Sequence, residues 1–100
     1  MCNIYSGQDP ARYEVTSRSL RIDGHSTSIR LENAFWDVLE RMADSEGRPV
    51  NDLIAALWHE AVAIRDARMN FASVLRSSCL IFLEASDRDE DGDEATAAAA

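Results

Sequence analysis

The dipeptide Asp23-Gly24 constrains this chain more than any other feature, because it lies between two stretches in which polar and apolar residues alternate. Asp-Gly in such a setting is a strong signal for a two-residue β-hairpin turn. A turn at this point pairs Ile22 with His25, and every residue before it then faces a defined residue after it. We therefore predict an antiparallel hairpin whose second strand runs to Leu31.

The same alternation gives the predicted hairpin two different faces, because successive strand residues point to opposite sides of a sheet. One face receives Leu20, Ile22, Thr27, Ile29 and Leu31. The other face is small, polar and positive and contains no acid; it receives Ser19, Arg21, Ser26, Ser28 and Arg30. An isolated two-stranded hairpin is only marginally stable in water. The apolar face must therefore pack against other elements, and the free strand edge calls for a partner.

Two helices are expected directly after the hairpin. Asn33 can cap the first helix by accepting a hydrogen bond from an amide of the first turn, and Gly47 is the expected left-handed residue at its end. The apolar stripe between them has helical spacing and consists of Phe35, Val38, Leu39 and Met42. After Pro49, a second helix is expected from about Val50 to about Ala67.

A third helix, capped by Asn70 and running from Phe71 to Glu84, is expected to be buried or to lie at an interface. Its apolar residues cover most of the helix circumference, which is unfavourable in water; they are Val74, Leu75, Cys79, Leu80, Ile81, Phe82 and Leu83. The fold class is thus mainly α with a short β element. Before the hairpin, an arm is expected to pack on the body through Ile4, Tyr5 and Tyr13.

These elements divide the chain into four segments of one domain, since 100 residues suffice for no more. They are an arm (1–17), a strand–helix–helix unit (18–67), a third helix (68–84) and an acidic, alanine-rich tail (85–100). The tail has little apolar surface to bury and is predicted to be disordered. A core of this size favours oligomerisation.

The net charge of −8 argues against a nucleic-acid ligand until it is divided by region. From Glu84 onward the chain has seven acids and only one base, Arg88, whereas residues 1–83 carry eleven acids and nine arginines. The body is therefore almost neutral. All ten basic residues are arginine, the side chain best suited to bidentate contacts with bases and phosphates.

Other function classes find little support in the sequence. No glycine-rich phosphate loop is present, and no serine has a recognisable histidine and acid partner, so we predict no enzymatic activity. Cys2 and Cys79 lack the spacing of a metal or redox motif and are expected to be reduced thiols. We expect no cofactor, no metal and no membrane segment, and a cytoplasmic, nucleoid-associated location.

The order of these motifs resembles the ribbon-helix-helix family of bacterial regulators. The resemblance rests on 27–33 before the first helix and on Gly47-Arg48-Pro49-Val50-Asn51, which looks like the inter-helix turn of the Arc-like repressors. Further blocks, at 1–5, 18–21, 24–36 and 70–76, are similar to a subfamily of small proteobacterial proteins regarded as DNA binders. The family implies a homodimer in which the strands of two chains pair and enter the major groove of double-stranded DNA.

The resemblance also implies roles for individual residues. Base contacts fall on the outward strand positions Ser26, Ser28 and Arg30, and the hairpin register adds Arg21 beside Ser26. The turn and the second helix supply phosphate contacts through Arg48, Val50 and Asn51, although Pro49 donates no amide and Asp52 adds a negative charge. The dimer core is expected to contain Ile29, Leu31, Phe35, Leu39, Leu53, Ile54, Leu57 and Trp58.

Alternative interpretations remain open at this stage. The Ser/Arg face is also compatible with an ordinary solvated strand surface. A second hypothesis is a protein-interaction module, antitoxin-like or an adaptor, that dimerises through the same fold and binds a protein through the third helix or the acidic tail. A third is a tetramer in which the third helix joins dimers on adjacent half-sites.

Overall fold

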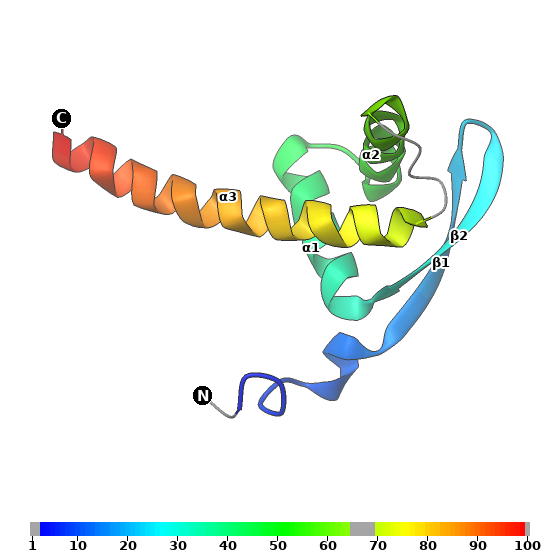
Figure 1. Ribbon diagram of the computed structural model, residues 1–100, viewed down its shortest axis with the longest axis horizontal. Helices are drawn as coiled ribbons and strands as arrows, with labels where there is room; N and C mark the ends of the chain where they lie inside the picture. The colour runs from blue at the N-terminus through cyan, green and yellow to red at the C-terminus, as the bar shows by residue number, and fades with distance from the viewer. Residues whose placement is uncertain (1–2, 65–69, 100) are drawn as a thin grey trace.

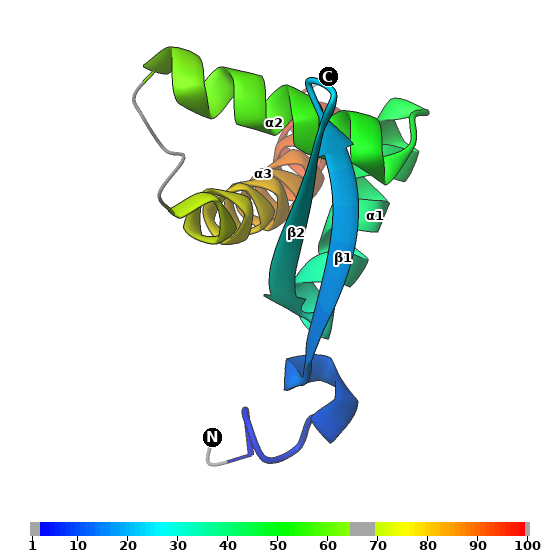
Figure 2. The same ribbon diagram turned by 90° about the vertical axis from the view of Figure 1, so that its right-hand side faces the viewer.

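The computed structural model describes residues 3–64 and 70–99, with side chains described as far as Arg88. A short 3₁₀ helix precedes a two-stranded antiparallel sheet, and three α-helices follow it (Figure 1). The elements are η1 (Pro10–Tyr13), β1 (Val15–Ile22), β2 (His25–Glu32), α1 (Asn33–Glu46), α2 (Val50–Ile64) and α3 (Phe71–Ala99). All three helices lie on one side of the sheet, so its other side is open (Figure 2). This architecture confirms the predicted fold class.

The hairpin has the predicted turn and register. Asp23 and Gly24 both have positive φ, 54° and 80°, which is the conformation that a two-residue type I′ turn requires. Ile22 pairs with His25, Arg21 with Ser26, and the ladder continues to Val15 opposite Glu32. Strand β1 is therefore longer than predicted, since it begins at Val15 and not near Arg18.

The inner face of the sheet carries the core. Leu20, Ile22, Ile29 and Leu31 are all buried, and they pack with the buried residues of the helices, namely Trp36, Val38, Leu39, Met42, Ala43, Leu53, Ile54, Leu75 and Cys79. Arg18 also lies on this face. Its guanidinium is 4.5 Å from the centre of the Trp36 ring and 3.0 Å from Glu40, so the charge remains at the rim of the core.

Helix α1 ends as predicted, but its beginning differs. Gly47 adopts the left-handed conformation (φ 67°), and Arg48 donates its amide hydrogen to Ala43 O at 3.1 Å, which closes the C-terminus. Asn33, expected to be the N-cap, is already the first residue of the helix. Its side-chain amide donates to Ala11 O at 2.8 Å, and its carbonyl accepts from the Thr16 hydroxyl. Asn33 therefore connects the arm and β1 to the helix instead of capping it.

The arm packs differently from the prediction. Ile4 and Tyr5 are 72% and 69% exposed, so neither anchors the arm to the body. Tyr5 instead stacks on Tyr13, with ring centroids 4.3 Å apart. The attachment to the body is polar, because the side-chain and backbone amides of Asn33 donate to Ala11 O and Glu14 O. Aromatic residues predict burial, and here the two rings mainly cover each other.

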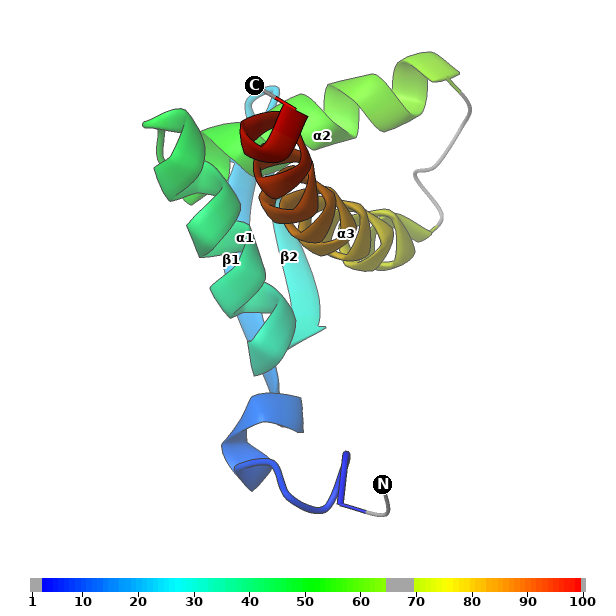
Figure 3. The same cartoon turned by 90° about the vertical axis from the view of Figure 1, so that its left-hand side faces the viewer.

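The third helix is longer than predicted. Its backbone is helical from Phe71 to Ala99, whereas the sequence predicts disorder from Ala85. Helical hydrogen bonds join residues four apart in the chain, so this segment can be helical without packing on the core. The extension projects away from the sheet (Figures 1 and 3). The predicted end of the second helix near Ala67 lies outside the described residues.

Candidate nucleic-acid interface

The outer face of the sheet is a solvent-exposed surface of serine and arginine. Every described residue that points outward between positions 17 and 30 is exposed; these residues are Ser17, Ser19, Arg21, Ser26, Ser28 and Arg30. We call this set the Ser/Arg face. The arrangement follows directly from the strand period, because the inner positions between them are those that contact the helices. Ser17 was missed by sequence analysis, since polar Thr16 and Arg18 conceal the alternation at the start of β1.

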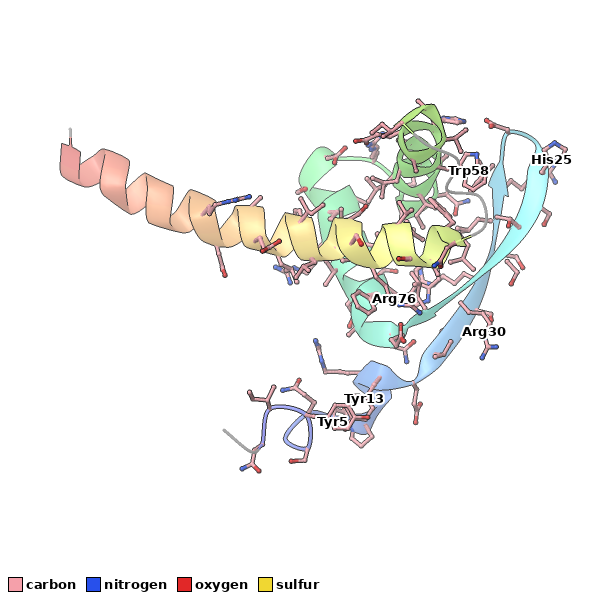
Figure 4. The ribbon with its side chains drawn as sticks, in the orientation of Figure 1. Tyr5, Tyr13, His25, Arg30, Trp58 and Arg76 are labelled. Atoms are coloured by element: carbon pink, nitrogen blue, oxygen red, sulfur yellow. The ribbon has the colours of Figure 1, made fainter. Side chains whose placement is uncertain are left out.

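The two arginines of this face lie in different settings. Arg30 projects from the sheet on the side away from the helices (Figure 4), and it has no ion-pair partner among the described residues. Arg21 bends toward the turn, and its Nη2 donates to Gly24 O at 3.1 Å. The turn is itself held, because Asp23 Oδ1 lies 2.7 Å from Nε2 of His59 on α2. The tip of the hairpin is thus tied to the helical layer.

Strand β2 has a free edge beside a groove. The described sheet contains only β1 and β2, so one side of β2 presents unpaired backbone groups. A cavity of about 600 Å³ runs along this edge between β2 and the α2–α3 region; it is lined by residues 25–30 and by Ile22, Asp23, Trp58, Phe71 and Ala72. Trp58 and Phe71 meet edge to face, with centroids 5.1 Å apart, and both are half-buried.

The predicted dimer-core residues divide into two groups. Five are already buried within one chain, and they are Ile29, Leu31, Leu39, Leu53 and Ile54. Phe35, Leu57 and Trp58 are only half-buried and retain surface that another chain can cover. Val62 and Ile64 near the end of α2 are also exposed, by 39% and 76%. The apolar face of α2 is therefore incompletely covered in the single chain.

The first turn of α2 carries the predicted phosphate-binding residues. Amides of Asp52 and Leu53 donate to Pro49 O at 3.1 and 3.2 Å, while Val50 and Asn51 stand at the start of the helix, where amides lack helical partners. Arg48 Nη2 pairs with Glu46 at 2.6 Å. Its Nε is buried and has no hydrogen-bond partner among the described atoms. Arg48 is therefore partly neutralised and less available to a phosphate than Arg30.

A further ion pair joins the end of β2 to α3. Arg76 Nε donates to Glu32 Oε1 at 3.0 Å, and the guanidinium carbon lies 5.9 Å from the centre of the Phe35 ring. A hydrogen bond from its own backbone amide, and then the side chain of Arg76, hold the pKa of Glu32 below its ordinary value despite partial desolvation. These contacts fix α3 to the point where the sheet becomes α1.

Other kinds of site find no support in the described part of the chain. Among the side chains that the structure describes, at 3–64 and 70–88, no group of three or more histidine, cysteine or acidic residues is placed to hold a metal ion. Among the same residues, no helix is long and apolar enough to cross a membrane. Cys79 is fully buried, and burial raises the pKa of its thiol to about 11, which makes it unreactive at neutral pH.

An open strand face followed by two helices joined at a left-handed glycine defines a class of small DNA-binding regulators that read DNA with β-strands. Residues 15–83 match the family model of the ribbon-helix-helix domain, so the chain belongs to the ribbon-helix-helix family. Domains of this family generally dimerise and bind DNA, and the family is one of regulators and not of enzymes.

A solved structure supports this assignment. The chain is similar to an uncharacterized protein from Bordetella pertussis Tohama I, with 40% sequence identity and a TM-score of 0.79. The match covers 89% of this chain and 71% of that protein. Among curated proteins, none matches this chain.

Proposed function

We propose that this protein is a homodimeric, sequence-specific DNA-binding regulator of transcription that inserts paired β2 strands into the major groove. The observation that carries the proposal is the Ser/Arg face, which is exposed along its whole length and has no acid among its outward positions from Ser17 to Arg30. DNA is a dense polyanion, and a positive, acid-free surface on a strand is the footprint that it requires. A nucleoid-associated location follows from this function.

The free edge of β2 is the proposed dimer contact. Pairing of residues 27–31 with the same residues of a second chain, centred on Ile29, supplies hydrogen-bond partners for the open edge. The half-buried Trp58 and Phe71, which line the groove, and the half-buried Leu57 on α2 then contact the second chain. This arrangement also brings Arg30 next to the partner's Ser28, so that both Arg30 side chains lie close to the two-fold axis.

Base recognition is assigned to Arg30, Ser28 and Ser26. Arginine can donate two parallel hydrogen bonds to guanine O6 and N7, and such a pair discriminates against other bases by about 1–3 kcal/mol. Serine donates or accepts and is less selective. The first turn of α2, with the amides of Val50 and Asn51 and the side chain of Arg48, is proposed to contact phosphate, with Arg48 weakened by Glu46.

A fluorescence-anisotropy titration tests this proposal, after selection of binding sites from a random duplex pool. Arg30→Ala is expected to relax the selected sequence and to weaken binding about 10- to 100-fold, in line with roughly 1–3 kcal/mol per arginine. Arg41→Ala is the matched control, because Arg41 is an exposed arginine on α1, on the other side of the sheet. Absent or salt-insensitive binding of the wild type to every duplex would overturn the proposal.

A protein-interaction module is the second candidate, favoured by the exposed apolar residues of α3. Leu80 and Ile81 are 58% and 60% exposed, and large aliphatic side chains on a charged helix are typical of protein contacts. In this case a stoichiometric protein partner is bound and DNA affinity is unmeasurable. A Leu80→Ser/Ile81→Ser variant separates the two functions, since it abolishes partner capture but leaves DNA binding unchanged.

A further inference from the structure

The sheet of the proposed dimer is wider than a two-stranded ribbon, because each β2 already has β1 on its other edge. Pairing across the free edge gives the strand order β1–β2–β2–β1, with the two β2 strands in the centre. Neighbouring strands are about 4.8 Å apart, so the axes of the outer strands are about 14 Å apart. The major groove is about 12 Å wide, which is enough for the two central strands but not for all four.

We propose that β1 contacts the phosphates that line the groove, through Ser17, Ser19 and Arg21, while β2 reads the bases. This inference rests on the proposed function. Each β1 axis lies about 7 Å from the two-fold axis, whereas the groove extends only about 6 Å to either side. The outward side chains of β1 are therefore placed above the two phosphate rows. Arg21, assigned to base contacts from the sequence, becomes a phosphate-binding residue.

The register on the sheet gives Arg21 a position different from that of Arg30. Arg30 lies opposite Ser17 and next to the centre of the proposed pairing, whereas Arg21 lies opposite Ser26 at the tip of the hairpin. Two Arg21 side chains thus occupy opposite corners of the four-stranded sheet. The two Arg30 side chains remain central, over the floor of the groove.

The contacts of Arg21 suit a phosphate ligand. Its Nη2 donates to Gly24 O, which holds the guanidinium against the turn and leaves other N–H donors free. The acid at the tip, Asp23, is engaged by His59. Ser17 and Ser19 add exposed hydroxyl groups along the same strand, and serine hydroxyls are common donors to phosphate oxygens. The outward residues Ser17, Ser19 and Arg21 of β1 therefore all carry hydrogen-bond donors, and none of them is a carboxylate.

The test compares Arg21 and Arg30 variants of the full chain on a duplex obtained by selection with the wild type. Neutralising one phosphate contact lowers the salt slope of log K by about 0.9, so Arg21→Ala in both chains lowers it by about 1.8. The ratio of the Kd of this variant to the wild-type Kd should then decrease about tenfold between 50 and 200 mM salt. A repeated selection with Arg21→Ala should return the wild-type sequence. Arg30→Ala should return a relaxed one.

Arg21→Lys distinguishes a lost contact from a damaged turn. Lysine binds phosphate as a point charge but cannot form the bidentate pair with guanine, so this variant should keep the wild-type salt slope and selected sequence. A changed selected sequence for Arg21→Ala or Arg21→Lys, or an unchanged salt slope for Arg21→Ala, would overturn the assignment of β1 to phosphate. If the wild type itself binds no duplex, the proposed function fails, which is a different result from normal wild-type binding with a silent Arg21→Ala.

Discussion

Replacing Ser28 with proline tests the proposed dimer directly, because it removes one donor from the free edge of β2 and spares the β1–β2 ladder. In a hairpin with a two-residue turn, the flanking pair Ile22–His25 is hydrogen-bonded, and every second pair after it is too. Ser28 faces Ser19 in the register, and this pair is one of the non-hydrogen-bonded pairs that alternate with the hydrogen-bonded ones. The amide of Ser28 therefore points away from β1, toward the free edge.

The magnitude follows from the ladder of the proposed dimer. With pairing centred on Ile29, Ser28 exchanges hydrogen bonds with the partner's Arg30, and the symmetric pair does the same. Proline in both chains removes both Ser28 donors, and each hydrogen bond contributes about 0.5–1.5 kcal/mol net. A loss of about 1–3 kcal/mol raises the dimer Kd about 5- to 160-fold. The proline ring enters a gap of about 4.8 Å between strands and weakens the dimer further.

Sedimentation equilibrium over a dilution series measures this change. Ser19→Pro is the matched control, since Ser19 is the partner of Ser28 in the register and its amide points to the outer edge of β1. We expect Ser28→Pro to become monomeric at concentrations where the wild type and Ser19→Pro are dimeric. Equal weakening by both substitutions, or an unchanged dimer for Ser28→Pro, would refute pairing through the edge of β2.

Three further expectations concern the stability and chemistry of the chain. Gly24→Ala should lower the unfolding free energy measured with urea by about 1–2 kcal/mol, because Gly24 has a φ of 80° and nothing lies within 4 Å of an added Cβ, so the cost is purely conformational. The lowered pKa of Glu32 contributes to the unfolding free energy above pH 4.5, and this contribution is lost as the pH falls through the folded-state pKa. Urea titrations at a series of pH values should therefore show a smaller acid-induced decrease in the unfolding free energy for Arg76→Ala than for the wild type. In a Cys2→Ser background, Cys79 should resist iodoacetamide at pH 8 until urea unfolds the chain, and rapid alkylation in the folded state, followed by mass spectrometry, would contradict its burial.

The hairpin was predictable because its information is local. Asp23-Gly24 requires a left-handed turn, and the period of two then assigns every side chain from Leu20 to Leu31 to a face. The end of α1 at Gly47 was predictable for the same reason, since glycine accepts positive φ without strain. In the candidate site, these two local signals were sufficient to place Ser26, Ser28 and Arg30 together on one exposed surface.

Features that depend on tertiary contacts were not predictable from the pattern. Strand β1 begins at Val15 because the carbonyl of Thr16 accepts the Trp36 indole N–H at 2.9 Å and the carbonyl of Glu14 accepts the amide of Asn33. Neither hydrogen bond has a signature in the sequence. The same contacts take Asn33 away from the capping role that its residue type suggests. The base contact predicted for Arg21 stays a prediction, and the phosphate contact proposed for it depends on the width of the dimer sheet, because strand alternation fixes the face of a sheet but not its width.

The position of the acidic segment resolves the conflict between a net charge of −8 and a DNA ligand. Helix α3 starts beside the sheet and leads away from it on the side opposite to the Ser/Arg face (Figure 1). Helix α3 last contacts the sheet through Arg76, which pairs with Glu32 at the end of β2. Glu84, where the acidic excess begins, is about 12 Å further along the helix at a rise of about 1.5 Å per residue. The screening length at physiological salt is about 8 Å. The acidic end therefore begins more than one screening length from the sheet and leads further away from it, so in the proposed function DNA that approaches β2 is attracted by Arg21 and Arg30 and only weakly repelled by the acidic segment.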